Sequence, residues 1–240
     1  MVKKDTIKRA LDILEKDKIN NIGIINFLKN NLILNIDILN ESVLVEGISD
    51  YKWVYISCKD KDNLKVIKDK LKKDDNNFAF VDEWMLPILT DGKEILWDLK
   101  AVQFYLPDDI KMLPIKYKTS ELTEADAAVV FNNSIYQDYI SEEYVKERIH
   151  KGISAGIYED NKLVSWSITQ DDGAIGFLHT LKNFRKKGYG KAVTFSLIEK
   201  LRNNGELPFA YVEENNQESM NILLKLGFKQ IKNVHWFQVK

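Results

Sequence analysis

The sequence predicts an α+β protein, with strands and helices in both halves of the chain. Some short segments alternate apolar and polar residues, as Leu163 to Thr169 do, and this is the period of a half-buried strand. Others repeat apolar residues at helical spacing, as at Val193, Leu197 and Leu201. A short basic, glycine-containing turn lies between these two segments.

The first half opens with helical patterns. Ile7 to Leu14 has apolar residues at helical spacing after Asp5 and Thr6, which can cap a helix, and Ile22 to Leu28 suggests a second helix. Beyond these, β-branched and aromatic runs predict strands, and one amphipathic stretch predicts a helix. The strands are expected at Ser42 to Val45, Trp53 to Ile56, Phe78 to Val81 and Ile95 to Leu106, and the helix at Asp60 to Lys73.

The second half is expected to run strand, helices, three strands, helix, strand, helix, strand from Ile115 onward. The long helix should end at Asn203-Asn204-Gly205, because glycine suits the left-handed residue that follows a helix. The other elements follow from the alternation typical of strands and the apolar spacing typical of helices. Helices are expected at Thr123 to Asn132, Ser141 to His150 and Asn216 to Leu226, and strands at Ala155 to Tyr158, Leu163 to Thr169, Ala174 to Leu181, Leu207 to Glu213 and Val234 to Val239.

A domain boundary is expected near Pro107-Asp-Asp and Pro114, where prolines interrupt the periodic segments. The expected domains are residues 1–113 and 114–240. The start of the chain carries charges where a signal peptide needs an apolar run, and no apolar run is long enough to span a bilayer. We therefore expect a cytoplasmic protein with no membrane partner.

Composition and charge exclude some functions. The 240 residues carry a formal net charge of −1, so no basic field indicates a nucleic-acid partner. The single cysteine, Cys58, cannot form an internal disulfide, which fits a reducing compartment. The histidines His150 and His235 show no ligand spacing with Cys58, so no metal site is expected.

The segment from Arg185 to Gly190, between a strand and a long helix, has the chemistry of an anion site. A helix start offers unpaired backbone N–H groups and the positive end of a dipole, which together suit a phosphate. Gly188 and Gly190 allow close approach, and the neighbouring lysines add positive charge. A Walker A loop needs Gly where Arg185 stands and Ser or Thr where Ala192 stands, so it is excluded. A dinucleotide-binding fingerprint needs a third Gly where Val193 stands, so it is excluded too. A solvated basic turn that merely begins a core helix is the simpler alternative.

The pattern Arg-x-x-Gly-x-Gly at Arg185 to Gly190 resembles the acyl-CoA pyrophosphate loop of the Gcn5-related N-acetyltransferases (GNAT). A second family segment follows at Asn216-Gln-Glu-Ser219 and closes with Leu226-Gly227-Phe228. Residues upstream of the loop look most like the glycine N-acyltransferase-like, or FR47-like, branch; they are Val164-Ser165-Trp166, Gly173, Ile175 and Thr180-Leu181. The resemblance covers roughly the last half of the chain.

The resemblance implies the GNAT fold, a mixed and mostly antiparallel central sheet flanked by helices, for residues 114–240. It also implies a degenerate copy of that fold for residues 1–113. An acyl-CoA, most simply acetyl-CoA, would be the donor and a small-molecule primary amine the acceptor, with direct attack on the thioester. The pantetheine arm would lie between the two splayed strands. The implied cofactor-binding residues are Leu178, Thr180, Arg185, Lys186, Lys187, Gly188, Tyr189, Gly190, Lys191, Asn216 and Ser219.

The sequence departs from the family at both usual catalytic positions. Related acyltransferases carry a Glu where Ala174 stands, and many superfamily members carry a Tyr general acid where Leu223 stands. His179 is the nearest titratable replacement, although a hydrogen-bonded sheet histidine is the more common role for such a residue. Tyr211 and Ser219 are alternative donors to the departing thiolate.

Two other functions stay open at this point. The substitutions at Ala174 and Leu223 also fit an acyl-CoA-binding sensor or partner module that has lost catalysis. A purely structural domain would bind no CoA at all. Neither the acceptor amine nor the oligomeric state follows from the sequence.

Overall fold

The computed structural model of the protein describes residues 2–112, 114 and 116–240, and its residues divide into two compact units. The first unit contains the chain up to Phe104 together with Val212–Lys240, and the second is Tyr105–Tyr211. The division into 1–113 and 114–240 stays a prediction, and Leu113, at its boundary, lies outside the described residues. Among the described residues, no helix is both apolar and long enough to cross a membrane.

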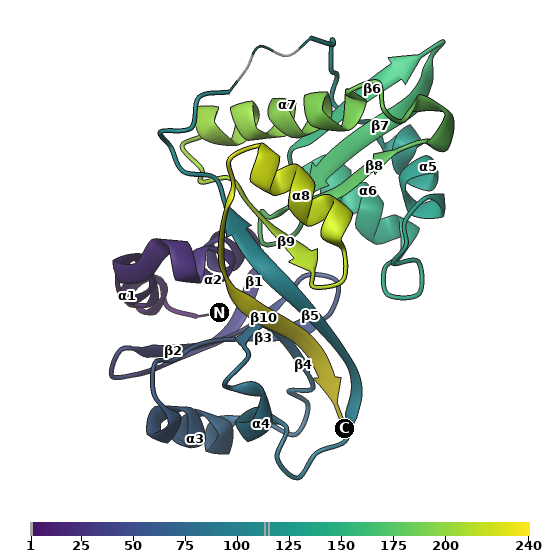
Figure 1. The fold of residues 1–240 in the computed structure, drawn as a ribbon. Coiled ribbons are helices and arrows are strands. Elements are labelled where there is room, and N and C mark those ends of the chain that lie inside the picture. Colours follow the sequence, from purple (N-terminus) through teal and green to yellow (C-terminus); the bar gives the residue numbers. More distant parts are fainter. Residues whose placement is uncertain (1, 113, 115) are drawn as a thin grey trace. The chain divides into compact units, whose positions relative to one another are not determined.

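The first unit begins with two helices and then alternates strands with shorter helices (Figure 1). Both opening helices confirm the helical spacing seen in the sequence, and α1 and α2 pack against strands β1 to β3. The strand β1 was not expected from the sequence. The elements are α1 (Lys4–Leu14), α2 (Lys18–Asn30), β1 (Leu32–Leu39), β2 (Ser42–Ile48), β3 (Lys52–Ser57), α3 (Lys61–Lys70), β4 (Asn77–Asp82), α4 (Leu86–Leu89), β5 (Ile95–Tyr105), α8 (Gln217–Lys225) and β10 (Lys229–Val239).

The strands of the first unit lie in the order β1-β2-β3-β4-β10-β5. Neighbours β1, β2 and β3 are antiparallel, whereas β3 and β4 are parallel, because the helix α3 returns the chain to the same end of the sheet. Phe78 stacks on Phe237 with ring centroids 4.8 Å apart in the core of this unit. The last strand, β10, is antiparallel to β4.

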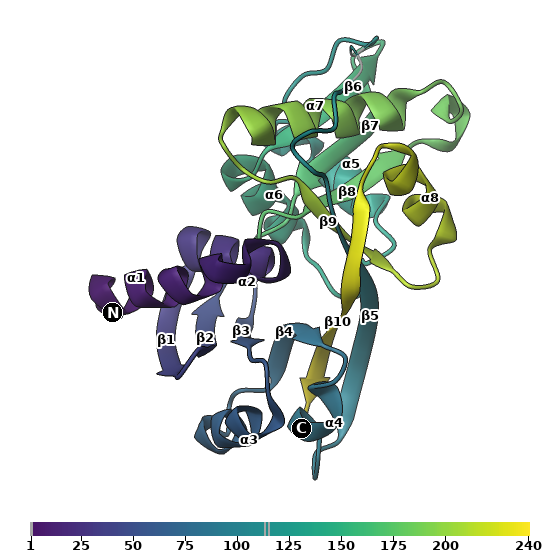
Figure 2. The same cartoon turned by 60° about the vertical axis from the view of Figure 1, so that its left-hand side comes forward.

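The second unit has its own mixed sheet, with strands in the order β9-β8-β7-β6. The pairs β6/β7 and β7/β8 are antiparallel and β8/β9 is parallel. The residues Trp166 and Ile168 of β7 form a core cluster with apolar residues of α5 and α6, and α7 packs against β6, β7 and β8 (Figure 2). The elements are α5 (Ala127–Asn132), α6 (Glu142–Lys151), β6 (Ser154–Glu159), β7 (Lys162–Thr169), β8 (Ile175–Thr180), α7 (Tyr189–Asn203) and β9 (Phe209–Glu213), whose last two residues cluster with the first unit.

Local signals along the chain determine several element ends. The Ser141 hydroxyl accepts a hydrogen bond from the Tyr144 N–H at the start of α6, and Gly205 adopts φ +73° after α7, both as expected. The stretch from Thr123 to Asn132 is the exception. There a capping box between Thr123 and Asp126 favours a 3₁₀ turn before α5 begins at Ala127, so the single expected helix is divided.

The same order of elements recurs in the two units. Three strands joined by short turns, a helix and a parallel strand appear as β1-β2-β3-α3-β4 in the first unit and as β6-β7-β8-α7-β9 in the second. In each unit the helix connects the two strands of the parallel pair. This recurrence supports the hypothesis that the first half is a degenerate copy of the second.

Candidate functional site

The turn after β8 leaves the start of α7 open to an anion. The chain passes through a 3₁₀ turn at Lys182–Phe184 and reaches Gly188, whose φ of +89° is a left-handed conformation that favours glycine. Within the described part of the chain no side chain caps α7, so the first N–H groups of the helix, at Tyr189, Gly190 and Lys191, have no intrahelical partner. These groups and the helix dipole form an anion site.

Hydrogen bonds and ring contacts fix the shape of this loop. The Tyr117 hydroxyl donates to the Lys187 carbonyl oxygen at 2.7 Å, and the Tyr117 ring meets the Tyr189 ring edge-on at 4.8 Å. The Tyr189 hydroxyl in turn donates to the Glu159 carboxylate. These contacts hold the backbone on both sides of Gly188, so the amides are oriented before any ligand arrives.

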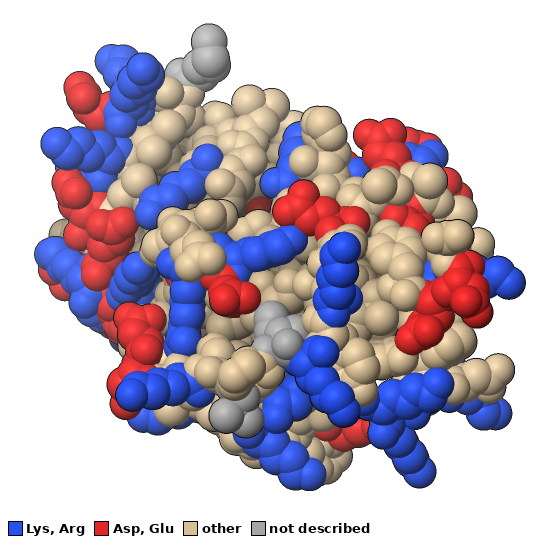
Figure 3. Space-filling view, turned by 90° about the horizontal axis from the view of Figure 1, so that it is seen from above, with Lys and Arg blue, Asp and Glu red and all other residues tan. Residues whose placement is uncertain are grey.

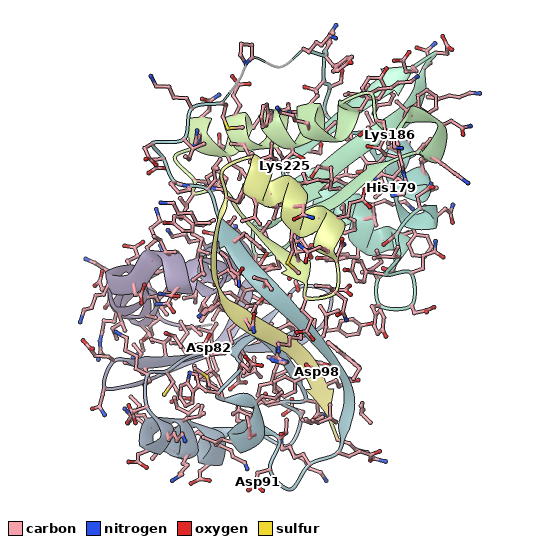
Figure 4. All side chains as sticks on the ribbon, viewed as in Figure 1. Asp82, Asp91, Asp98, His179, Lys186 and Lys225 are labelled. Atoms are coloured by element: carbon pink, nitrogen blue, oxygen red, sulfur yellow. The ribbon has the colours of Figure 1, made fainter. Side chains whose placement is uncertain are left out.

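The charges on the loop are positive and mobile. Lys186, Lys187 and Lys191 are exposed, and Lys187 Nζ lies 5.0 Å from the centre of the Phe184 ring. Lys186 lies in the turn and His179 on the strand before it (Figure 4). Seen from above, both Lys and Arg and Asp and Glu occur on the visible face of the molecule (Figure 3).

Strands β8 and β9 are joined at one position and then part. Ile175 and Ala210 are the paired residues, and within the described chain no further pair joins β9 to the rest of β8. A β-bulge at Phe177, with φ +51°, interrupts the pairing of β8 with β7 as well. The backbone edge of Leu178 to Thr180 that faces β9 is therefore available to pair with an extended ligand.

The side chains of Leu178 and Thr180 lie toward the start of α7. A Cβ added at Gly190 would come within 3.4 Å of Thr180 Oγ1 and 4.0 Å of Leu178 Cδ1. The guanidinium of Arg185 is bound back to this strand, because its Nε donates to the Thr180 carbonyl oxygen at 3.0 Å. The structure thus brings together the loop residues and the strand residues that the sequence singled out.

His179 has the environment of a stacked sheet histidine. Its ring lies on the indole of Trp166, with centroids 4.9 Å apart and planes 25° apart, and Trp166 is fully buried. Burial and, second, the charge of Arg185 lower the pKa of His179, so the ring is neutral at neutral pH. A neutral imidazole can accept a proton, and the role of His179 as a base stays a prediction.

Tyr189 does not have the environment of a general acid. Its hydrogen bond to Glu159 raises the pKa of Tyr189 to about 12, so the hydroxyl keeps its proton and serves to anchor the loop.

Asn216 and Ser219 form a helix cap in the first unit. The Asn216 side chain accepts a hydrogen bond of 3.0 Å from the Ser219 N–H, which begins α8 as the sequence indicated. Leu223, in the same helix, is buried. The assignment of Asn216 and Ser219 to the cofactor stays a prediction.

Sequence reasoning missed one buried carboxyl beside the candidate site. Asp172 lies in the turn between β7 and β8, is only 3% exposed, and accepts a hydrogen bond of 3.0 Å from the Ala174 N–H. Ala174 itself is buried at the position where the resemblance led us to expect a Glu. Asp-Asp-Gly is an ordinary turn sequence, so only the burial of its second residue distinguishes Asp172.

Two cavities lie away from the loop. One of about 400 Å³, at the far end of α7, contains Lys200 and His150, but Lys200 Nζ is already bound by Glu121 and the Ser154 carbonyl oxygen. Another of about 290 Å³ lies in the first unit beside Cys58. Among the residues that the structure describes, no group of three or more His, Cys, Asp or Glu side chains gathers as metal ligands do.

The comparable helix start in the first unit is closed. The Asp60 carboxylate caps α3 by accepting from the Asn63 N–H at 2.8 Å, so a negative side chain occupies the place that a phosphate would need. This helix start therefore lacks the open anion site that α7 has.

Comparison with known proteins agrees with this geometry. Residues 152–237 match the family model described as FR47-like protein. These residues include the loop, the parting strands and the cap of α8. The resemblance to the GNAT superfamily and its FR47-like branch is confirmed.

The fold is the GNAT fold, extended over the whole chain. A Drosophila protein of known structure superposes with a TM-score of 0.82 at 15% identity, covering 100% of this chain and 97% of the other. A GCN5-related N-acetyltransferase-like protein from Streptococcus suis gives 0.58 at 14% identity, covering 98% and 99%. A tandem GNAT protein from the clavulanic acid biosynthesis pathway gives 0.58 at 12%, covering 98% and 95%. No curated protein sequence matches the chain significantly.

Proposed function

We propose that the protein is an N-acetyltransferase that moves an acetyl group from acetyl-CoA to a primary amine of a small molecule by direct attack. The observation that carries this proposal is the uncapped, glycine-bounded start of α7 beside the parted strands β8 and β9. One feature accepts the pyrophosphate of a CoA and the other its extended, amide-bearing arm.

The chemistry follows from how the two substrates meet. The loop amides at Tyr189, Gly190 and Lys191 hold the diphosphate, with Arg185, Lys186 and Lys187 adding charge. The open edge of Leu178 to Thr180 pairs with the pantetheine amides and brings the thioester toward the bulge at Phe177. A backbone N–H there stabilises the oxyanion that forms when the amine attacks.

Orientation supplies much of the expected rate. Holding an amine against a bound thioester replaces a bimolecular encounter, and this lowers the activation barrier by on the order of several kcal/mol. An alkyl ammonium has a pKa of about 10 in water and must lose a proton before its nitrogen attacks, so a proton acceptor is also needed. Cys58 is a buried free thiol, which fits work in a reducing compartment such as the cytoplasm.

Thiol release measured against a panel of primary amines tests the proposal. Wild-type protein with acetyl-CoA should release CoA at a rate that depends on the amine, and mass spectrometry should find the acetylated amine. The panel should hold amino acids, aliphatic monoamines and polyamines. Release that is independent of every amine would contradict the proposal.

A sensor or partner module is the second candidate, favoured by the buried apolar residues Ala174 and Leu223 at the usual catalytic positions. Such a protein would bind acetyl-CoA and raise its melting temperature without turnover. Saturation at a hundred times Kd stabilises a fold by about 2.7 kcal/mol, which a thermal melt detects easily. A melt that CoA does not shift would contradict both candidates and favour a structural domain.

A further inference from the structure

The turn between β7 and β8 holds a carboxyl group in an unusual place. The Gln170 N–H donates to the Ala174 carbonyl oxygen at 2.8 Å and the Gly173 N–H to the Gln170 carbonyl oxygen at 3.0 Å, which closes a tight hairpin. Gly173 takes φ +83°, a conformation that favours glycine. Turn carboxylates usually face water, but this hairpin directs Asp172 inward, where it is 3% exposed.

Asp172 has polar partners but no cation. Its carboxylate accepts a hydrogen bond of 3.0 Å from the Ala174 N–H, and the Tyr211 hydroxyl acts on it to lower its pKa. Among the described residues, no Lys, Arg or His side chain forms an ion pair with it. Burying a carboxylate without a counter-charge is costly, and folded proteins keep such groups mainly where they serve a function.

These partners place Asp172 where the two strands begin to part. Ala174 immediately precedes Ile175, which pairs with Ala210, and Tyr211 immediately follows Ala210 on β9. Asp172 is thus bound to the residue just before β8, at the closed end of the gap where Ile175 pairs with Ala210. In the proposed function the thioester lies in this gap, and the inference below depends on that function.

Charged and titratable groups surround the turn that carries Asp172. Asp171 is its neighbour in the turn and accepts a hydrogen bond of 3.3 Å from the Tyr144 hydroxyl of α6. The guanidinium of Arg148 lies 5.5 Å from the centre of the Tyr144 ring and pairs with Glu147. Tyr144 also packs against Phe177 of the bulge, with ring centroids 6.3 Å apart.

We propose that Asp172 is the catalytic residue that takes the proton from the acceptor amine. The ammonium gives one proton to the Asp172 carboxylate, and the neutral nitrogen attacks the thioester carbon. A C–N bond forms, the C–S bond breaks, and the sulfur leaves with its electron pair. The second nitrogen proton passes to that sulfur and gives free CoA thiol, and Asp172 then releases its proton to water.

The electrostatics support this assignment. Burial and, second, the negative charge of Asp171 raise the pKa of Asp172 to about 7, while the hydrogen bond from the Ala174 N–H and the nearby Tyr211 hydroxyl oppose the rise. A base with a pKa near the working pH is ionised often enough to act and basic enough to accept a proton. His179, by contrast, has its ring stacked on Trp166 and lies near the positive charge of Arg185.

Conservative variants of three neighbouring residues test the proposal through the pH dependence of kcat/KM. The kcat/KM of wild type should rise with pH, and this ascending limb of the profile should have its midpoint near pH 7. Asp172→Asn should lose that limb and about a hundredfold or more in kcat, and Asp172→Glu should recover part of it. Asp171→Asn removes the repulsion and should move the limb to lower pH, whereas Tyr211→Phe removes a hydroxyl that lowers the pKa of Asp172 and should move the limb to higher pH.

The controls separate this proposal from the proposed function. Acetyl-CoA should shift the melting temperature of Asp172→Asn as it shifts wild type, and His179→Gln should keep the limb. If Asp172→Asn turns over like wild type with the limb intact, Asp172 is not the base, although the enzyme stands. If the limb disappears in His179→Gln instead, the base is His179. If wild type binds CoA but acetylates no amine, both the enzyme and its base are overturned.

Discussion

The Tyr117 hydroxyl donates a 2.7 Å hydrogen bond to the carbonyl oxygen of Lys187, the residue just before the left-handed glycine that begins α7. Seventy positions separate the two residues in the chain. The contact ties a segment of no regular structure to the loop in which we place the CoA pyrophosphate. It gives the loop a fixed shape that its own residues do not provide.

Tyr117→Phe should weaken CoA binding. The variant keeps the ring packed on Tyr189 but leaves the Lys187 carbonyl without its donor, so a loop that was ordered in advance must be ordered on binding. The loss of one hydrogen bond is worth about 1 kcal/mol, which corresponds to roughly a fivefold increase in Kd by calorimetry. Tyr51→Phe, at an exposed tyrosine of the first unit, is the matched control and should leave Kd unchanged. Equal Kd values for both variants and wild type would show that this bond does not shape the site.

Gly188→Val should weaken CoA binding by at least about tenfold, because a branched side chain would stand where the phosphate approaches. The nearest atom to an added Cβ is Tyr117 Cε2 at 3.7 Å, so the fold has room for it, but the φ of +89° adds strain. Gly205→Val is the control, since Gly205 has a φ of +73° and open space at the other end of α7. Both variants should lower the melting temperature to a similar extent, and only Gly188→Val should change Kd. A Gly188→Val protein with wild-type affinity would place the pyrophosphate elsewhere.

Each chain should bind one CoA. The start of α3 in the first unit is occupied by the Asp60 carboxylate, whereas the start of α7 is uncapped, so one of the two repeated helix starts is an anion site. Isothermal titration should give a stoichiometry near one, and Gly188→Val should weaken that binding by at least about tenfold. Tight residual binding in Gly188→Val would reveal a site in the first unit and contradict the closure by Asp60.

Asp172 should make the stability of the protein depend on pH. Its pKa is raised from an ordinary value of 3.8 to about 7, so the folded state holds this proton more tightly than the unfolded state does. The resulting contribution to stability is fully present below pH 3.8 and is lost as the pH rises through about 7. Asp172→Asn, which cannot ionise, should therefore gain in melting temperature relative to wild type as the pH rises from about 4 to about 8. A difference between the two proteins that stays constant over this range would show that the Asp172 pKa is not raised.

The sequence by itself determined the local features of this protein. The spacing of Val193, Leu197 and Leu201 set the long helix, Gly205 its end and Asn216 the start of the next helix, because caps and periodicity act within a few residues. It also determined the candidate phosphate loop, since glycines such as Gly188 and Gly190 let an anion approach the backbone N–H groups wherever a strand leads into a helix. The resemblance to GNAT proteins rested on these same local residues.

Only the tertiary structure decided which groups meet. The parting of β8 from β9 after Ile175, the tie from Tyr117 to Lys187 and the burial of Asp172 all depend on residues far apart in the chain. An Asp-Asp-Gly turn has the same letters whether its carboxyl faces water or the interior, and only packing sets its solvation. The physical reason is that burial and charge, which make a carboxyl a base at neutral pH, are properties of its surroundings and not of the residue.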